Sequence, residues 1–169
     1  MTHGRNGYYE VAVGNRAIYL RVHGLASMNN CLCARDFIEQ EMAGAHSFLI
    51  VDLGDCTGLD STFMGIMAGA ATHPRSNPPP AVAVVNATPS LKTLLTDVGL
   101  TELLLVEDEP FDESGIEFVR LPDDGTEEER LACVREAHES LIRISASNER
   151  IFRPFLAALE SDMKKKGML

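Results

Sequence analysis

Three short apolar runs, separated by segments of helical character, constrain the fold of this chain most strongly. The runs span residues 48–51, 81–85 and 103–106. None of them alternates apolar with polar residues, so each is expected to be a strand that is buried on both faces. Buried strands that alternate with helices predict an α/β domain with a mainly parallel sheet.

The remaining segments complete this order. Residues 8–13 and 17–22 alternate and flank Gly14-Asn15, which predicts an antiparallel hairpin. Helices are expected over 25–43, 61–72 and 89–98, the first capped by Asn29 or Asn30 and ended by Gly44. Residues 54–58 are expected to form a loop, and 73–80, with four prolines, an irregular segment. The predicted order is β-β-α-β-α-β-α-β, with the site in the loop after the strand at 48–51.

A helical pattern of a different kind begins at Thr126. Thr126 and Glu129 form a capping box, and His138 falls on the apolar face of the helix that follows. A second helix is expected after a break at 145–148, with a kink or a late start at about Arg153 because of Pro154. We therefore divide the chain into an α/β domain over 1–122 and a C-terminal helical extension over 123–169.

The charge of the chain is concentrated in one segment. The formal net charge is −10, and 12 of the 25 acidic residues lie between Glu102 and Glu129 together with a single base, Arg120. An acidic chain argues against a nucleic-acid binder and against a polybasic membrane-surface protein. The chain also has no apolar run long enough to span a bilayer, and its first ten residues lack a signal-peptide core. We expect a cytoplasmic protein.

The four cysteines do not have the spacing of a metal site. Cys31 and Cys33 are separated by one residue, and Cys56 and Cys133 stand alone. Structural zinc sites use paired Cys-x2-Cys or similar spacings, and disulfides are rare in a reducing cytosol. We expect small buried or half-buried side chains, no metal and no cofactor.

The segment from Val51 to Gly69 carries the chemistry. Asp60 stands at a helix N-cap position, and Ser61 and Thr62 are the first helical residues. A phosphate on Ser61 would lie at the positive end of the helix, so the helix would tolerate it while the local surface changed charge. The alternative interpretation is an ordinary Asp cap followed by two small polar residues.

The helix predicted over 61–72 contains no charged residue. An ordinary surface helix has a polar face. Phe63, Met64 and Met67 must therefore be covered either by the C-terminal extension or by a partner protein, and Met and aromatic residues are favoured at adaptable interfaces.

At these residues the sequence resembles the STAS domain of bacterial anti-sigma factor antagonists and sulphate transporters. Asp60-Ser61-Thr62, followed by Gly65, matches the family's marker at the start of the helix after the central strand, and residues 49–52 match that strand. Asn86 and residues 94–100 resemble the family's fourth strand and third helix. The resemblance covers about residues 8–110 and implies a STAS-type mixed sheet of four to five strands. Phe63-Met64 stand where the family commonly has Gly-Leu.

The resemblance implies a signalling function in transcription regulation without enzymatic activity. The unphosphorylated antagonist would bind an anti-sigma factor serine kinase and release a sigma factor, phosphorylation would end the interaction, and a PP2C-type phosphatase would restore it. Ser61 would be the phosphoacceptor, with Thr62 as the second choice. The residues expected at the partner surface are Asp60, Ser61, Thr62, Phe63, Met64 and Met67.

Two other classes of function stay open. The chain could be a constitutive STAS scaffold, or a subunit of a signalling complex, that oligomerises through its C-terminal helices, for example as a homodimer. It could also be an enzyme with Ser61 as nucleophile, but Ser61 lacks a Gly-x-Ser-x-Gly context, and neither His46 nor His73 is placed as its base.

Overall fold

A computed structural model describes residues 7–44, 46–72 and 82–169. Its six-stranded sheet has the order β5-β4-β3-β2-β1-β6. The strands are β1 (Tyr8–Val13), β2 (Ala17–Ala26), β3 (Phe48–Leu59), β4 (Val82–Val85), β5 (Leu105–Val106) and β6 (Val119–Arg120). β1 pairs antiparallel with β2 and β6, and β2 to β5 run parallel. The predicted α/β class, hairpin and element order are confirmed.

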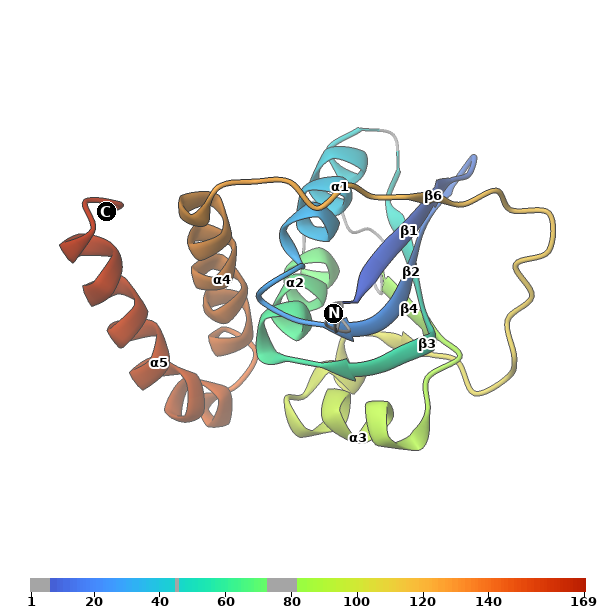
Figure 1. The fold of residues 1–169 in the computed structure, drawn as a ribbon. Helices are drawn as coiled ribbons and strands as arrows, with labels where there is room; N and C mark the ends of the chain where they lie inside the picture. The colour runs from blue at the N-terminus through green and yellow to red at the C-terminus, as the bar shows by residue number, and fades with distance from the viewer. Residues whose placement is uncertain (1–6, 45, 73–81) are drawn as a thin grey trace, which may run out of the picture.

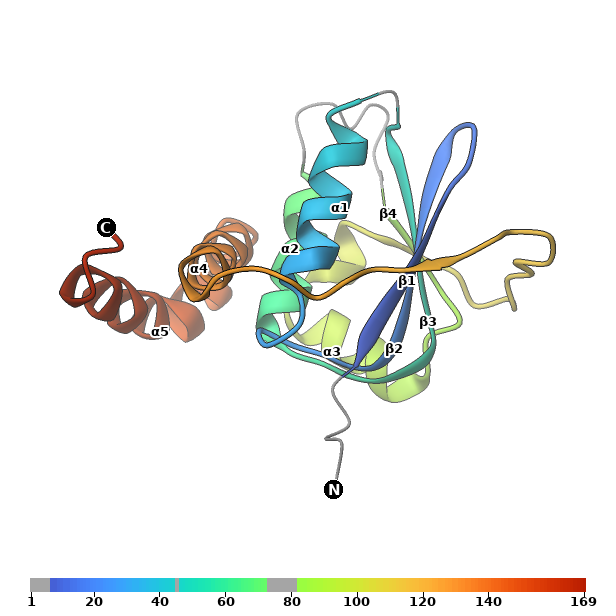
Figure 2. The ribbon, with the colours of Figure 1, turned by 45° about the horizontal axis from the view of Figure 1, so that its top comes forward.

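Helices cover one face of this sheet. They are α1 (Leu32–Met42), α2 (Ser61–Ala71) and α3 (Pro89–Asp97), with a 3-10 turn, Leu100–Glu102, before β5. Right-handed crossovers between successive parallel strands place all three helices on the same side. Figure 2 shows α1 and α2 on one side of the sheet and the chain between β5 and β6 on the other.

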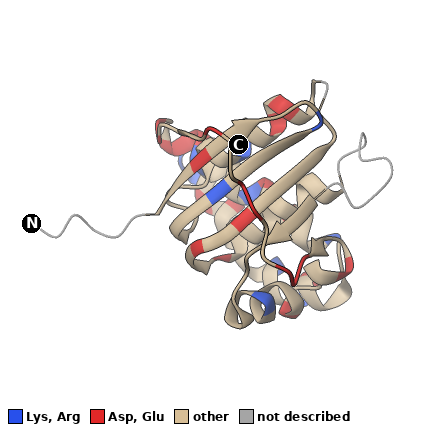
Figure 3. Ribbon diagram, turned by 90° about the vertical axis from the view of Figure 1, so that its right-hand side faces the viewer, with Lys and Arg blue, Asp and Glu red and all other residues tan. Residues whose placement is uncertain are grey.

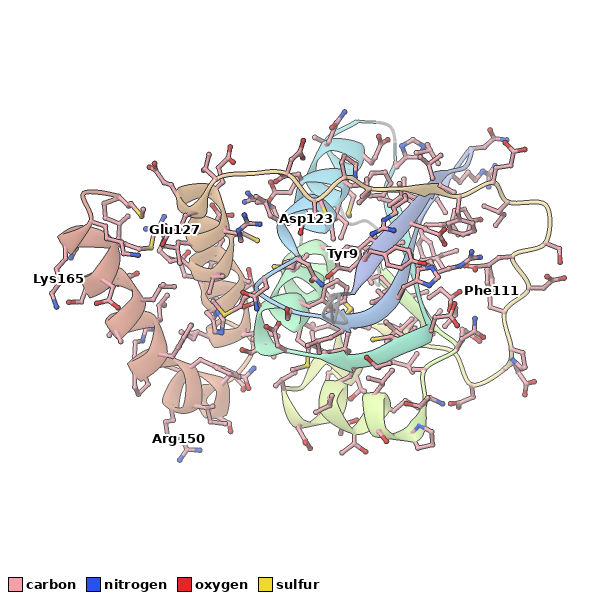
Figure 4. All side chains as sticks on the ribbon, viewed as in Figure 1. Tyr9, Phe111, Asp123, Glu127, Arg150 and Lys165 are labelled. Carbon is pink, nitrogen blue, oxygen red and sulfur yellow. The ribbon has the colours of Figure 1, made fainter. Side chains whose placement is uncertain are left out.

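The C-terminal extension forms a hairpin of two helices, α4 (Glu127–Ile142) and α5 (Ala146–Lys165), in which α4 packs beside α2 and α5 lies outermost (Figure 1). The capping box of Thr126 and Glu129 is present, and the Ser145 hydroxyl accepts the N–H of Asn148 at the start of α5. Lys166 pairs with Glu127 at 2.7 Å, so the end of α5 meets the start of α4 (Figure 4). None of the helices in the described ranges is long and apolar enough to cross a membrane.

Several predicted boundaries were wrong. β3 continues through the expected loop at 54–58, because these residues stay paired with β2 across two register shifts. β2 therefore extends to Ala26, and α1 begins only at Leu32, not at residue 25. α5 begins at Ala146 with Pro154 inside it, so the late start near Arg153 was also wrong. The proline-rich segment 73–80 lies outside the described residues.

Caps and edge strands account for the other differences. Neither Asn29 nor Asn30 caps α1. Asn30 is buried and its side chain contacts the Tyr9 hydroxyl, the Ser27 N–H and two carbonyl groups, so that it holds the β2–α1 turn together. The last predicted strand is short and half-exposed at the sheet edge, and β6, which adds the sixth strand, was not predicted.

An acidic segment, residues 107–118, crosses the open face of the sheet, which Figure 3 shows. On this face Arg21 of β2 pairs with Asp52 of β3 at 3.5 Å and with Glu113 of the segment at 2.7 Å. Arg21 also lies over the Phe118 ring, 3.8 Å from its centroid, while Asn86 accepts the N–H of Phe111. Phe111 is labelled on this side of the sheet in Figure 4. Burial and the neighbouring Asp52 carboxyl raise the pKa of Glu113 to about 7, although Arg21 acts to lower it.

A glycine sets how closely α4 approaches α2. A Cβ atom on Gly65 would overlap the backbone of Ala137 in α4, whereas one on Gly69 would meet only the Ser140 hydroxyl, at 3.3 Å. The two helices therefore touch backbone to backbone at Gly65. Cys133, Ala137 and Leu141 of α4 belong to the same buried cluster as α1, α2 and the sheet.

We predict that Gly65→Ala lowers the free energy of unfolding by roughly 1–3 kcal/mol, because the added methyl group must push α4 away. Gly69→Ala is the matched control: it has the same gain in helix propensity, and the side chain that it meets can rotate. Urea denaturation of both variants measures the difference. A Gly65→Ala variant as stable as Gly69→Ala would contradict the close packing.

Glu113→Gln tests the segment over the sheet. A carboxyl whose pKa is raised on folding contributes stability that is fully present below its unfolded pKa of about 4.5 and is lost as pH rises through about 7. As the pH rises from 5 to 8, the free energy of unfolding of Glu113→Gln should therefore increase relative to that of the wild type, by on the order of 2 kcal/mol. Glu117→Gln, an exposed change on the same segment, should give a curve parallel to the wild type. Parallel curves for Glu113→Gln would show that this carboxyl is not buried against Asp52.

Candidate functional site

Asp60 holds the start of α2 in place. It is the N-cap of α2, as the sequence predicts, with extended backbone at φ −96° and ψ 174°. Its Oδ1 accepts the N–H of Phe63 at 3.0 Å, and its Oδ2 accepts the N–H of Met28 at 2.7 Å. A carboxylate at a helix N-terminus satisfies free N–H groups and complements the helix dipole. Because both oxygens are used, Asp60 also joins the β2–α1 turn to α2.

Ser61 and Thr62 differ in exposure. Ser61 is the first residue of α2 and is partly exposed, whereas Thr62 is only 2% exposed. Both hydroxyls follow the Asp60 cap in the sequence, but the Thr62 side chain faces the interior. Of the two candidate phosphoacceptors, Ser61 is the one that a protein outside the chain can reach.

The hydroxyl of Ser61 binds a histidine from the C-terminal extension. Its Oγ lies 2.9 Å from Nε2 of His138 in α4, and the His138 Nδ1 lies 2.7 Å from the carbonyl oxygen of Val134. A carbonyl oxygen can only accept, so Nδ1 carries the proton and Nε2 is an acceptor. Ser61 therefore donates its proton to His138, and this hydrogen bond joins the start of α2 to the middle of α4.

The environment of His138 keeps its imidazole neutral. The side chain is buried, and burial lowers its pKa below the ordinary value of 6.5, against the opposing effects of the Val134 carbonyl and the Asp60 charge. Two rings of α5 pack on it: the centroids of Phe152 and Phe155 lie 5.6 Å and 4.6 Å from the imidazole centroid. The ring is thus an uncharged acceptor that faces a hydroxyl on one side and aromatic carbon on the other.

Most of the residues expected at a partner surface lie in the core. Phe63 stacks on Tyr9 with centroids 5.8 Å apart, and Met64 and Met67 are buried as well. Of the two ways to cover α2, the structure shows the first: the extension, through α4, covers it. A partner can reach Asp60 and Ser61, but not the buried side chains of Thr62, Phe63, Met64 and Met67.

Three exposed apolar side chains lie on segments that contact Asp60 or His138 and were not predicted. Met28 lies in the turn after β2 and its own N–H binds Asp60, while Leu25 pairs with Gly58 near the end of β3. Phe155 packs on His138 from α5. Their exposed fractions are 38%, 45% and 42% for Met28, Leu25 and Phe155. We call Leu25, Met28 and Phe155 the apolar rim of Ser61.

His138 was the only one of these residues with a signal in the sequence. It falls on the apolar face of a predicted helix, between Val134 and Leu141, where a polar side chain needs a polar contact. That contact is Ser61, 77 residues away. Nothing in the sequence indicates which polar group meets the histidine.

The Ser61–His138 pair has one feature of an activated nucleophile, a neutral imidazole that accepts the serine proton. A nucleophilic site also needs a place for a substrate. The apolar cavity between α1, α2 and α4, of about 120 Å³, is lined by Gly65, Ile66, Cys133, Ala137 and neighbouring side chains, and not by Ser61 or His138.

Among residues 7–44, 46–72 and 82–169, no cluster of three or more His, Cys, Asp or Glu side chains is arranged to hold a metal ion.

The four cysteines are free thiols. Cys31, Cys56 and Cys133 are buried and Cys33 is partly exposed, as expected from their spacing. A hydrogen bond between the thiols of Cys31 and Cys133, together with burial, raises the pKa of Cys31. The same hydrogen bond lowers the pKa of Cys133, which lies on α4. Two protected thiols therefore lie at the contact between α4 and the rest of the domain.

Comparison of the structure with solved proteins identifies the fold. An anti-sigma factor antagonist from Mycobacterium paratuberculosis superposes with a TM-score of 0.55 at 16% sequence identity, over 64% of this chain and 92% of that one. SpoIIAA, an anti-sigma factor antagonist, matches in its unphosphorylated form with a TM-score of 0.48 and 15% identity, over 60% of this chain and 89% of that one. The phosphorylated form of SpoIIAA, described as a Bacillus cell fate determinant, matches with a TM-score of 0.46 and 16% identity, over 60% of this chain and 92% of that one.

Comparison of the sequence gave no further match, either to a protein-family model or to a curated protein. The identities to the solved structures are low, so the comparison concerns the fold. The fold of this chain is that of an anti-sigma factor antagonist, which confirms the STAS-type architecture expected from Asp60-Ser61-Thr62 and the order of the strands.

Proposed function

We propose that this protein is a phosphorylation-switched protein-binding module in which Ser61 is the phosphoacceptor. In its unphosphorylated form it binds an anti-sigma factor serine kinase and so releases a sigma factor in the cytoplasm of a bacterium. Phosphorylation of Ser61 ends binding, and a PP2C-type phosphatase restores it. The observation that carries the proposal is the position of Ser61, a partly exposed residue that opens α2 directly after the Asp60 cap.

The charge around Ser61 makes a phosphate a strong signal. α2 contains no charged residue, and the Asp60 carboxylate is already held by two N–H groups. A phosphate would add about −1.5 to −2 charge beside this carboxylate. The free N–H groups of the helix start can tolerate the anion, so the change concerns the surface that a partner meets and not the formation of α2.

The fold supports the same class of partner. The solved protein with the highest TM-score among those reported is an anti-sigma factor antagonist. A partner that reaches Ser61 also meets the apolar rim of Leu25, Met28 and Phe155. Large apolar side chains that flank a polar centre are typical of protein interfaces, and we expect the kinase to bury them.

A constitutive scaffold is the alternative, and one observation favours it. Ile151 and Phe155 of α5 are both exposed, at 59% and 42%, and could pair with a second copy of the chain. Sedimentation velocity decides between a monomer and a homodimer. A dimer that Ile151→Asp dissociates, together with no phosphate at Ser61, would support the scaffold.

We predict that an anti-sigma factor serine kinase from the same genome, with ATP, places one phosphate on Ser61, which mass spectrometry of the peptides locates. Ser61→Ala should abolish the modification. Thr62→Val, a change of similar volume that removes the buried hydroxyl, should leave it in place, because Thr62 faces the core. Phosphate on Thr62, or none on either residue, would contradict the proposed function.

A further inference from the structure

The contact between Ser61 and His138 works only for an unmodified serine. The Nδ1–H of His138 is committed to the Val134 carbonyl, so Nε2 can accept a hydrogen bond but has no proton to donate. A phosphoserine has no hydroxyl proton, and its oxygens are acceptors. At the observed distance of 2.9 Å between Oγ and Nε2 there is also no room for a phosphoryl group between the two side chains.

Protonation of Nε2 would restore a contact with the phosphate, but the surroundings of His138 do not favour it. A phosphate could bind the ring only if Nε2 gained a proton, which would place a cation on a side chain that is only 2% exposed. The groups that face the imidazole are the Val134 carbonyl on α4, the Asp60 carboxylate at the start of α2, and the Phe152 and Phe155 rings on α5. Asp60 favours the cation, but burial opposes it more strongly, and the pKa of His138 is lowered.

The α4–α5 hairpin is joined to the rest of the domain by one exposed connection and is held together by contacts of its own. It follows an exposed stretch, residues 122–126, and it has its own caps and its own ion pair between Lys166 and Glu127. Besides its apolar contacts, the hairpin is held to the rest of the domain by Ser61–His138, by an Arg35–Glu136 ion pair at 2.6 Å, and by Asn148, which donates to the Val98 carbonyl. Of the residues in these polar contacts, Ser61 is the one that the proposed function modifies.

We propose that the α4–α5 hairpin reads the phosphorylation state of Ser61: it docks on α2 when the Ser61 hydroxyl is free to donate to His138, and it leaves α2 when Ser61 carries a phosphate. This inference rests on the proposed function, because it assigns a regulatory role to the same serine. Its consequence is a larger change of surface than the phosphate alone produces. Phe155 packs on His138, so release of the hairpin also moves the Phe155 side chain away from the start of α2.

The cysteines provide the readout. Cys133 on α4 and its neighbour Cys31 are protected where α4 meets the domain, at 1% and 0% exposure. Cys56 is buried on β3, and its thiol donates to the carbonyl of Gly58 in the same strand. Release of α4 should expose Cys133 and Cys31 but not Cys56, whereas global unfolding exposes all three.

The experiment uses the full chain with phosphoserine incorporated at position 61 during translation, so that no kinase is needed. A maleimide labels the thiols, and mass spectrometry of the peptides gives the rate at each cysteine. Loss of the Ser61–His138 hydrogen bond leaves a buried acceptor unpaired and weakens the docking of α4, so we expect the labelling rate of Cys133 to rise by roughly tenfold or more. The matched control is phosphoserine at Ser90, an exposed serine in the first turn of α3, which should leave every rate unchanged.

The outcomes separate this inference from the proposed function. Equal Cys133 rates with and without phosphate at Ser61, or a rate for Cys56 that rises together with Cys133, would overturn the inference. A kinase that modifies Ser61 while Cys133 stays protected would leave the proposed function intact and remove the hairpin's role. Faster labelling of Cys133 in the phosphoserine protein, combined with no kinase that modifies Ser61, would support the inference and contradict the proposed function.

Discussion

The backbone contact between Gly65 of α2 and Ala137 of α4 is the interaction on which the rest of the structure depends. α2 has no charged residue, so it needs cover on the side away from the sheet as well as on the side that packs against it. A residue without a side chain lets α4 approach closely enough to cover that side. The same approach brings His138 to Ser61 at the start of the helix. One packing requirement of α2 thus places the extension over the residue that we propose as the phosphoacceptor.

Charge is distributed to suit this arrangement. The acidic segment crosses the open face of the sheet, where Arg21 neutralises part of it, and it lies on the opposite side from the helices (Figures 2 and 3). The helical side near Ser61 has an uncharged helix, a capped carboxylate and a neutral imidazole. A phosphate there would add charge to a region in which the Asp60 carboxylate is already bound by two N–H groups and the imidazole is neutral.

The sequence predicted the parts of the fold that depend on local patterns. The first two buried strands, the capping box at Thr126 and the Asp60 cap each have a signal within a few residues, and the structure confirms them. The extension of β3 through residues 54–58 could not be predicted, because pairing with β2 overrides the loop-forming tendency of Gly54 and Gly58. Asn30, one of the two residues expected to cap α1, is buried instead, since its partners include Tyr9 and the carbonyl of Gly7, which only the folded chain brings near. For the same reason Ser61 could be singled out from its neighbours in sequence, whereas its contact with His138 depends on how segments far apart in the sequence pack in the folded chain.

The hydrogen bond between Ser61 and His138 is the central claim, and nitrogen-15 NMR of the His138 ring tests it most directly. In the unphosphorylated protein at neutral pH, the ring should be a neutral imidazole with its proton on Nδ1, and Ser61→Ala should shift the Nε2 resonance. With phosphoserine at position 61, the account predicts the averaged signals of a solvent-exposed histidine that titrates near 6.5. A ring protonated on Nε2 in the unphosphorylated protein, or spectra that do not change on phosphorylation of Ser61, would contradict it.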